Sequence, residues 1–340
     1  MVELSVLMSV RNGEKFLAEA VKSVLDQSFG DFEFLILDNA STDKSVAIIE
    51  SFVDPRIRLI KNNTDLGQTR ALNKGVALAK GRLLARMDAD DVSLKRRFET
   101  QMKAFERHPA AVVIGSWHEE VDEKGRFLKI MRYPVDPLEI KCHLLSDGDL
   151  TRRCFAHPTV MMKTAVLREK GGYDESIRFA QDYELWTRLF SDCEMHNIPE
   201  PLLRYRASHT STSNTNREEM KRELDWIAGS TVRRLWPDID DRAAGALVAM
   251  LRNRAPLAGT EWDDLSAIFD GLFARLFSKE ELTDRHRALR ERIKMYYWPR
   301  LASHDISSAM TAFRLGIGRV PLVVADGKFH KNIAKTLFRR

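Results

Sequence analysis

Short apolar runs alternate with segments of helical periodicity through the first part of the chain. The apolar runs, each of which predicts a buried strand, occupy residues 4–10, 32–37, 57–60 and 83–87. Between the first two runs, apolar side chains from Phe16 to Leu25 recur on one helical face, and a second helical pattern runs from about Gln68 to Ala79. This alternation predicts an α/β fold with a Rossmann-like, mostly parallel sheet and helices on both faces.

The pattern changes further along the chain. The predicted elements there are a basic amphipathic helix at 93–108, a strand at 111–117, a hairpin at 119–132 and a last strand at 199–207. Residues 143–153 carry charges with little periodicity and predict a loop, either beside a substrate or as a plain surface connection. From about residue 217 the apolar spacing becomes helical.

We predict two domains from this change. Residues 1–215 form the α/β domain, in two halves at 1–110 and 111–215, and residues 216–340 form a C-terminal helical region. The helical stretches of that region run from about 217 to 236 and then lie near 240–254, 261–277 and 279–297, before one short apolar run at 320–324.

Three acids end the apolar run at 83–87. Asp88, Asp90 and Asp91 follow it within four residues, so Asp88 and Asp90 lie at the carboxyl end of a predicted strand. Ligands bind at that edge of open α/β sheets, and crowded carboxylates repel one another unless a cation neutralises them. A hard divalent ion such as Mg²⁺ suits such donors together with substrate phosphates. The alternative is an acidic turn that caps a helix beginning near Ser93.

Other strand ends carry polar residues that can share the same crevice. The first strand ends at Ser9-Val10-Arg11-Asn12 and the second at Asp38-Asn39, and Arg70 lies at a helix start that suits phosphate binding. The chain has no GxGxxG after the first strand and no GxxxxGK[ST]. Their absence weighs against a dinucleotide oxidoreductase and a P-loop enzyme.

These motifs, in this order, resemble the family 2 glycosyltransferases of GT-A fold. The matching segments are 9–13, 25–28, 37–43, 63–73 and 87–91. The resemblance implies that Asp38 holds the nucleotide base and that Arg70 lies beside the nucleotide. It also implies that Asp88 and Asp90 form a DxD motif, which binds the ribose and a divalent metal, Mg²⁺ or Mn²⁺, on the diphosphate.

Two positions depart from the family pattern. Arg11 stands where the family usually has an aromatic residue, and Asn39 stands where it has a second acid. Ser9 remains a candidate for a backbone contact to the nucleotide sugar, and Arg11 is retained among the nucleotide-sugar-binding residues.

The resemblance continues in the second half of the α/β domain. Gly171-Gly172-Tyr173-Asp174 and then Gln181-Asp182-Tyr183-Glu184-Leu185-Trp186 are similar to the family's final block, with Gln181 in place of the usual glutamate. The resemblance makes Asp182 the general base that takes the proton of the attacking hydroxyl, a step that needs a carboxylate at neutral pH. The alternative is that Asp182 caps the helix that begins at Tyr183.

Further residues match the family less specifically. Arg97 and Gln101 fall where the family has an arginine and a glutamine after its DxD. His209 lies near the position of a histidine that contacts metal or diphosphate in some members, or it is a simple exposed loop residue. Arg204 and Arg206 alternate out of the last strand and can serve the same anionic pocket.

Composition adds the setting. The chain has 340 residues, a net charge of +5 and three cysteines without zinc spacing, which is typical of a reducing, cytoplasmic compartment. We find no signal peptide and no apolar run of spanning length, and the scattered basic residues do not predict nucleic-acid binding. The basic tail after Asp326 either lies on the inner face of a membrane or packs on the protein or on a twin subunit.

The sequence therefore predicts a metal-dependent, inverting glycosyltransferase of polysaccharide biosynthesis. It would move a sugar from a nucleotide-diphosphate sugar, with UDP as the guess from the resemblance, to a hydroxyl of a glycan or lipid-linked glycan. Two alternatives remain: a sugar nucleotidyltransferase, and an inactive nucleotide-sugar-binding protein.

Overall fold

A computed structural model describes residues 2–146, 154–207, 216–252, 262–277 and 284. The chain clusters into two compact units, Met1–Thr231 and Val232–Arg340. The predicted domain boundary between residues 215 and 216 stays a prediction. His209, the helix at 279–297, the run at 320–324 and the basic tail lie outside the described residues, with the exception of residue 284.

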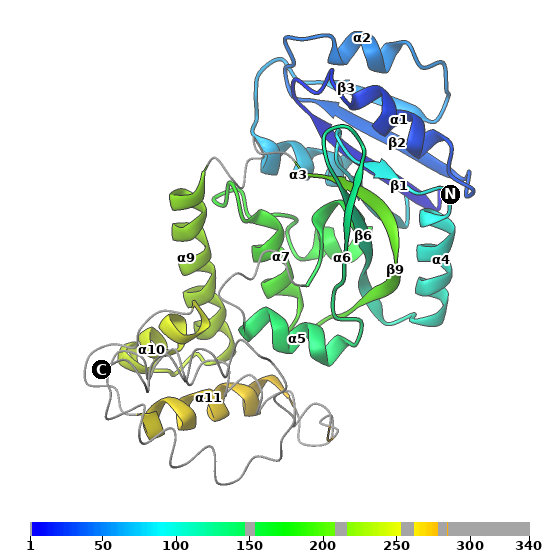
Figure 1. Cartoon of the computed structure of the whole chain (residues 1–340). Coiled ribbons are helices and arrows are strands. Elements are labelled where there is room, and N and C mark those ends of the chain that lie inside the picture. The colour runs from blue at the N-terminus through cyan, green and yellow to red at the C-terminus, as the bar shows by residue number, and fades with distance from the viewer. Residues whose placement is uncertain (1, 147–153, 208–215, 253–261, 278–283, 285–340) are drawn as a thin grey trace, which may run out of the picture. The chain divides into compact units, whose positions relative to one another are not determined.

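One mixed sheet forms the centre of the first unit (Figure 1). Its strands are β1 (Leu4–Val10), β2 (Phe32–Asp38), β3 (Ile57–Lys61), β4 (Leu83–Met87), β5 (Val92–Ser93), β6 (Ala111–Val121), β7 (Phe127–Met131), β8 (Met161–Lys163) and β9 (Glu194–Arg206). The order is β3-β2-β1-β4-β8-β6-β9-β5, and β7 pairs with β6. The first four strands are parallel, β8 is antiparallel to both of its neighbours, and β6 and β9 are parallel.

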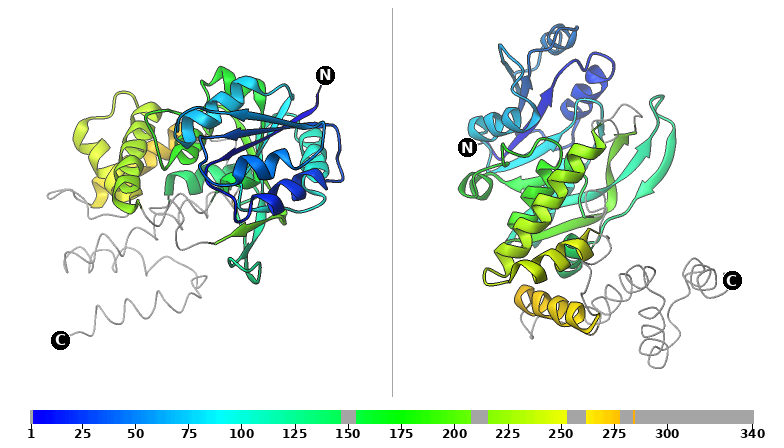
Figure 2. Two further views of the ribbon diagram at one scale, coloured as in Figure 1. Left: turned by 90° about the horizontal axis from the view of Figure 1, so that it is seen from above. Right: turned by 90° about the vertical axis from the view of Figure 1, so that its left-hand side faces the viewer.

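Helices cover both faces of the sheet (Figure 2). The side chains of α1 (Leu17–Leu25), α2 (Ser45–Glu50) and α4 (Arg97–Arg107) share one buried core with alternate strand residues such as Val6 and Met8. On the other face, α3 (Gln68–Leu78) packs on β1 and β2, and α6 (Thr164–Glu169) packs on α3. Gly75 permits this packing, because a Cβ there would lie 2.2 Å from Leu7 Cδ1. Burying each large aliphatic side chain in such a core contributes about 1.5–3 kcal/mol.

The structure corrects three predicted elements. The helix predicted at 93–108 begins only at Arg97, because Val92–Ser93 pairs with β9 as strand β5. The acids before it therefore do not cap a helix. Residues 143–146 belong to helix α5 (Pro137–Ser146) rather than to a loop, whereas 147–153 lie outside the described residues. The last strand begins at Glu194 and continues past Pro199 and Pro201, where its register against β6 shifts.

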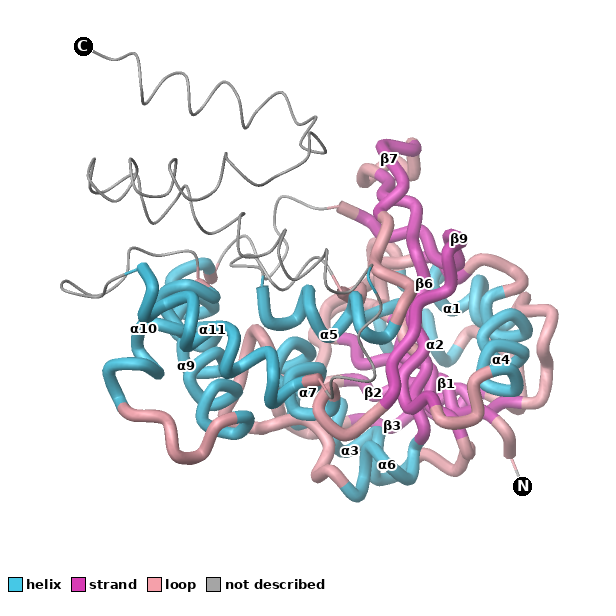
Figure 3. Tube along the Cα trace, turned by 90° about the horizontal axis from the view of Figure 1, so that it is seen from below, coloured by secondary structure: helices cyan, strands magenta, loops and turns pink. Residues whose placement is uncertain are grey.

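β6 continues beyond its predicted end to pair with both β7 and β9. These three strands stand side by side as an upright ribbon in Figure 3. The hairpin expected at 119–132 is present, with Phe127 and Leu128 exposed on β7.

Helices make up the described part of the second unit. α9 (Arg217–Leu235) runs across the boundary between the units, and α10 (Asp241–Leu251) packs on α11 (Trp262–Leu276). The Arg275 guanidinium lies 3.8 Å from the centre of the Trp236 ring. No helix among the described residues is both long enough and apolar enough to cross a membrane.

Candidate active site

Three carboxylates gather where β4 ends. Asp88, Asp90 and Asp91 each offer an oxygen within 4.8 Å of the others. The chain turns directly after β4, a buried strand, and this turn brings the acids together. Sequence analysis singled out Asp88 and Asp90, and the structure adds Asp91.

The environment of these acids disfavours their negative charge. Asp91 is 2% exposed, and one carboxyl oxygen accepts the backbone N–H of Arg206 at 2.9 Å while the other has no partner among the described residues. Burial, followed by Asp88 and Asp90, raises the pKa of Asp91 well above its usual value. Asp90 is an exposed residue, but desolvation of its carboxyl and the charge of Asp88 raise its pKa to about 6. An orphaned carboxyl oxygen and raised pKa values fit a site for a hard divalent cation.

Arg86 is the positive charge inside this cluster. Its side chain is 3% exposed and forms an ion pair with Asp88. Its charge also lowers the pKa of Asp90, Asp91 and Asp182, which opposes the effect of burial on all three. Sequence analysis did not single out Arg86, because it lies inside an apolar run that predicts a strand.

Arg97 and Gln101 support β4 from inside the core rather than facing a ligand. Arg97 is fully buried, and it donates from Nη2 to the carbonyl of Arg86 at 2.7 Å and from Nε to Oε1 of Gln101 at 3.1 Å. Gln101 in turn donates to the carbonyls of Ile114 and Thr159, both at 2.8 Å. Burial, with the charge of Arg86, lowers the pKa of Arg97 to about 9. These bonds fix the strand that carries the acids to its neighbours.

Asp182 lies in the first turn of α7 (Gln181–Leu189). The N-cap of this helix is Ala180, so Asp182 is a helical residue and not the cap. One carboxyl oxygen accepts the N–H of Tyr183 at 2.8 Å. Burial raises the pKa of Asp182 to about 6. The N–H of Tyr183 and the charge of Arg86 oppose this rise, whereas the charge of Asp88 adds to it. Asp182 and Asp88 are therefore close enough to interact electrostatically across one site.

A pair of buried polar side chains lies beside both carboxylates. Nε2 of His157 is 2.8 Å from the hydroxyl of Tyr173. Burial raises the pKa of Tyr173, and the charges of Asp182 and Asp88 both add to that rise. The indole of Trp186 packs edge-on to His157, and its Nε1 has no partner among the described residues. This grouping gives the site a buried aromatic wall.

The loops after β1 and β2 are tied to each other. Arg11 forms an ion pair with Asp65, and Asp65 also accepts the side-chain amide of Asn39 at 2.6 Å. Asn12 and Ala40 adopt positive φ angles of 53° and 58°, a strained conformation that is concentrated at functional sites. Asn39 thus has a bonding role in this network, with its Oδ1 accepting the N–H of Leu66 at 2.9 Å.

Asp38 ends β2 with one oxygen available. The residue is 3% exposed, its Oδ2 accepts the N–H of Ser41 at 3.3 Å, and its Oδ1 has no partner among the described residues. Ser9, half-buried at the end of β1, lies one strand away and pairs in register with Leu37. Both residues are at the carboxyl edge of the parallel strands, the same edge as the acids after β4.

Arg70 is exposed in the first turn of α3, with Nε 3.3 Å from a carboxyl oxygen of Glu175. One turn later, Asn73 exchanges two hydrogen bonds with the backbone of Tyr173, at 2.8 and 2.9 Å. The preceding Gly172 has a φ of +69°, and a Cβ there would lie 2.5 Å from Asn73 Oδ1. The Gly-Gly-Tyr-Asp segment therefore joins the nucleotide-side helix to the Asp182 side of the site.

The two arginines of the last strand differ in placement. Arg206 is buried, and it donates its backbone N–H to Asp91 and its Nε to the carbonyl of Asp90, the latter at 3.0 Å. Arg204 pairs with Glu119 at 2.8 Å instead. His209, a candidate metal ligand, lies outside the described residues.

Comparison with known proteins agrees with this arrangement. The sequence model of a family described as Glycosyl transferase family 2 matches residues 5–168. An uncharacterized glycosyltransferase of Methanocaldococcus jannaschii is 36% identical over 208 residues, which cover 60% of this chain and 70% of the relative. The O-antigen biosynthesis glycosyltransferase WbnJ of Escherichia coli is 32% identical over 218 residues, or 62% of this chain and 82% of the relative.

Solved structures resemble the fold. S. aureus TarS in complex with UDP-GlcNAc aligns with a TM-score of 0.59 at 15% identity, over 91% of this chain and 92% of that chain. The mannosyltransferase PcManGT of Pyrobaculum calidifontis, in complex with GDP-Man and Mn²⁺, aligns with a TM-score of 0.50 at 13% identity, over 92% of this chain and 87% of that chain. At such identities the likeness concerns the fold alone, and the predicted GT-A type of α/β fold is confirmed.

Proposed function

This chain belongs to glycosyl transferase family 2, and from that premise we propose that it is a metal-dependent, inverting glycosyltransferase. It would move one sugar from a nucleotide-diphosphate sugar to a hydroxyl of a glycan or a lipid-linked glycan. The observation that carries the proposal is the cluster of three carboxylates after β4, one oxygen of which is buried without a partner among the described residues. Such a cluster at the carboxyl edge of the parallel strands suits the metal of a nucleotide diphosphate.

The nucleotide is proposed to bind along the ends of β1, β2 and β4. Asp38 offers a buried oxygen that has no partner in the described part of the chain, which suits a donor on the base. Ser9 contributes from the end of β1, and Arg11 and Arg70 supply exposed guanidinium groups for the phosphates once they leave Asp65 and Glu175. UDP is our first choice for the nucleotide, supported by the UDP-GlcNAc bound to TarS, with GDP as the alternative from the GDP-Man bound to the mannosyltransferase.

Asp88 and Asp90 would hold a divalent metal, with the buried Asp91 within reach of both. The donor set contains only carboxylate oxygens, as Mg²⁺ and Mn²⁺ prefer. A bound ion would neutralise the negative charge that grows on the departing diphosphate. It would also relieve the repulsion that raises the pKa values of Asp90 and Asp91.

Asp182 is proposed to act as the general base. Its carboxylate takes the proton of the acceptor hydroxyl while the hydroxyl oxygen forms a bond to the anomeric carbon. The bond from that carbon to the diphosphate oxygen breaks on the opposite side, so the configuration inverts. With a pKa of about 6, Asp182 is mostly ionised at pH 7 and still accepts a proton better than an ordinary aspartate.

The acceptor is proposed to be a glycan or a lipid-linked glycan. The O-antigen role in the name of the E. coli relative supports this class. Peripheral membrane contact through the tail after Asp326, a cytoplasmic location and self-association remain predictions.

The test combines binding with product analysis. The full chain is screened by thermal shift against UDP, GDP and their sugars, with Mn²⁺ and with EDTA, because a ligand that binds only the folded state raises the melting temperature. We expect a metal-dependent rise with one nucleotide, followed by transfer from its sugar that inverts the anomeric configuration. Retention of configuration, or binding without any turnover, would overturn the proposal.

A further inference from the structure

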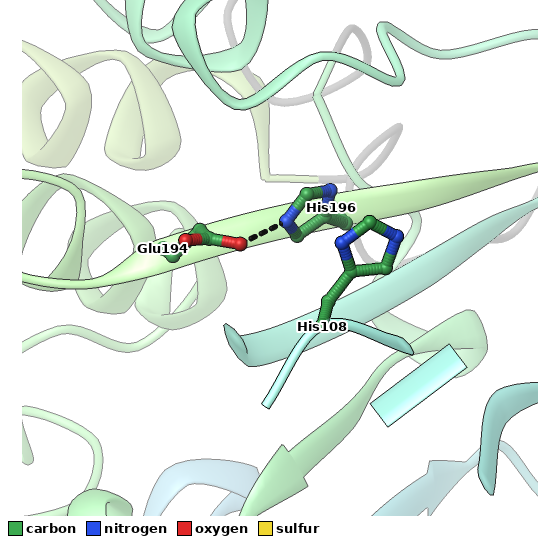
Figure 4. Close-up of side chains that lie close together, drawn as sticks. All are labelled: His108, Glu194 and His196. Atoms are coloured by element: carbon green, nitrogen blue, oxygen red, sulfur yellow. Dashed lines mark hydrogen bonds and ion pairs between the residues drawn. The ribbon is translucent and has the colours of Figure 1, made fainter. Parts of the chain in front are cut away.

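Two histidines and a glutamate form a second cluster of metal-ligand type. His108, Glu194 and His196 each offer one ligand atom within 4.8 Å of the other two. Figure 4 shows the two imidazole rings facing each other, with Glu194 hydrogen-bonded to His196. The ring centres are 4.1 Å apart, and Nε2 of His196 lies 2.5 Å from a carboxyl oxygen of Glu194.

Strand pairing explains why residues so far apart in sequence meet. β6 begins at Ala111, three residues after His108, and Ala111 is in register with Glu194 at the start of β9. Glu194 and His196 are two residues apart on one strand, so their side chains point to the same face. The backbone of His108 is fixed on both sides, since its N–H donates to Ala104 and its carbonyl accepts from Ala111, both at 2.9 Å.

The cluster is preorganised and open to solvent. Pro109 follows His108 and disfavours a helical backbone there, and His108 lies outside the helical region at φ −124° and ψ 70°. His108 is exposed and Glu194 is half-buried, so an ion can reach the site.

We propose that His108, Glu194 and His196 bind a zinc-type transition-metal ion, which fastens the end of α4 to the start of β9. Imidazole and carboxylate are the ligands that Zn²⁺ accepts, at about 2.0–2.2 Å from the metal. Ligand atoms around one tetrahedral ion lie about 3.3 Å apart, so small side-chain rotations suffice to close the site. Three protein ligands leave a fourth position for water.

This site is separate from the acids after β4. Glu194 and His196 lie at the start of β9, whereas Arg206, which bonds Asp90 and Asp91, ends the same strand. The ten residues from His196 to Arg206 span about 33 Å of extended strand. The donors of the histidine site also select different ions, because imidazole nitrogens favour Zn²⁺, Ni²⁺ and Co²⁺ over Mg²⁺. The proposal therefore stands or falls independently of the proposed transferase activity.

The experiment measures metal binding by the full chain after chelator treatment and dialysis. Zn²⁺ is titrated against a chromophoric chelator in excess Mg²⁺, which occupies carboxylate sites, and Co²⁺ binding is followed by its visible absorption. We expect the wild type to bind one equivalent of zinc. The variants His196→Gln and His108→Gln, each tested alone, should bind zinc about 100-fold or more weakly, since each lacks one direct ligand. His143→Gln is the matched control, as it removes a histidine outside the cluster.

Both variants must keep the melting temperature of the chelated wild type for the comparison to count, and exposed His108 is the position where the fold is least at risk. Asp90→Asn should keep the zinc equivalent. The proposal is overturned if the wild type binds no zinc in excess Mg²⁺, or if both histidine variants bind it as tightly as His143→Gln.

Discussion

At the end of β4 three carboxylates crowd together, whereas at the start of β9 two imidazoles and one carboxylate meet. The acids are kept close despite their repulsion, which with burial raises the pKa of Asp90 to about 6, and one oxygen of Asp91 has no partner among the described residues. In the other cluster, Glu194 already accepts a hydrogen bond from His196, and the two imidazole rings are in contact at an interplanar angle of 30°.

We interpret the acidic cluster as part of the proposed catalytic site and the histidine cluster as a proposed structural metal site. In the acidic cluster, Arg86 offsets only part of the cost of burying three neighbouring carboxylates, so a bound cation would relieve the remainder. This is the cluster that we propose holds the metal of the diphosphate. In the histidine cluster a hydrogen bond already joins Glu194 to His196, and the His108 ring contacts His196, so a metal would add a link between the end of α4 and β9. Asp38 Oδ1 and Trp186 Nε1, two further buried atoms without a partner among the described residues, likewise belong to the proposed transferase site.

Removing the proposed base should have the largest effect. Asp182→Asn keeps the shape of the side chain but cannot accept the hydroxyl proton, so kcat should fall by about 10²–10⁴-fold with little change in donor affinity. Steady-state kinetics and thermal shift with the nucleotide measure the two quantities. An unchanged kcat would exclude Asp182 as the base.

A change at the acidic cluster should alter the metal requirement. Asp90→Asn removes one of the proposed oxygen ligands, and we expect Mn²⁺ to be bound at least about tenfold more weakly, with a matching loss of rate at low Mn²⁺. Titrating the rate with Mn²⁺ measures this shift, and His196→Gln serves as the control for Mn²⁺ binding. Equal Mn²⁺ affinity in Asp90→Asn and the wild type would contradict the assignment.

The pH dependence should follow Asp182. Its pKa of about 6 predicts that kcat is constant near pH 7 and falls as the pH drops through about 6, because the protonated carboxyl cannot act as a base. Gln181→Glu places a second negative charge beside Asp182, which disfavours ionisation and should move this acidic limb to higher pH by on the order of half a unit.

Gln181 is buried, and its side-chain amide donates to the carbonyls of Phe179 and Arg178, both at 3.2 Å. The melting temperature of Gln181→Glu is therefore measured alongside its pH–rate profile. Acidic limbs that coincide in the two proteins, with both folded, would show that Gln181 does not tune the base.

The smallest expected effect is a gain in the stability of the folded protein. With EDTA at pH 7, Asp90→Asn should be slightly more stable than the wild type, by up to about 1 kcal/mol, because it removes a charge that its surroundings disfavour. The folded state holds the Asp90 proton more tightly, so wild-type stability falls as the pH rises from 3.8 toward 6, and the gain should vanish near pH 4. Urea unfolding at both pH values measures it; a loss of stability at pH 7 would contradict the repulsion inferred for the acids.

The sequence predicted those strands whose apolar pattern is contained within a short segment. The buried strands β1, β2 and β4 follow from short apolar runs, and the edge that carries Asp38, Asp88 and Asp90 follows from their parallel order. Helix α5 was overlooked because its apolar face is poorly defined, and the start of β9 was placed too late because Pro199 and Pro201 argue against a strand.

Contacts between distant residues could not be predicted in the same way. In the sequence, Asp91 is only a third acid in a turn, and its hydrogen bond from Arg206 depends on the fold. Arg86 is likewise a single charge in an apolar run, and the fold pairs it with Asp88. His108 and Glu194 carry no local motif at all, and only the β6–β9 register brings them together. The family pattern identified Arg97 and Gln101 without revealing that they brace β4 from inside the core.

Strand β9 reaches both clusters, because Glu194 and His196 lie at its start and Arg206 lies at its end. A slip by a single residue would turn the first two side chains to the opposite face and withdraw Arg206 from the loop of Asp90 and Asp91. The irregular pairing around Pro199 and Pro201 sets the spacing between those ends. During evolution, β9 should therefore tolerate amino-acid substitutions more readily than the insertion or deletion of a residue.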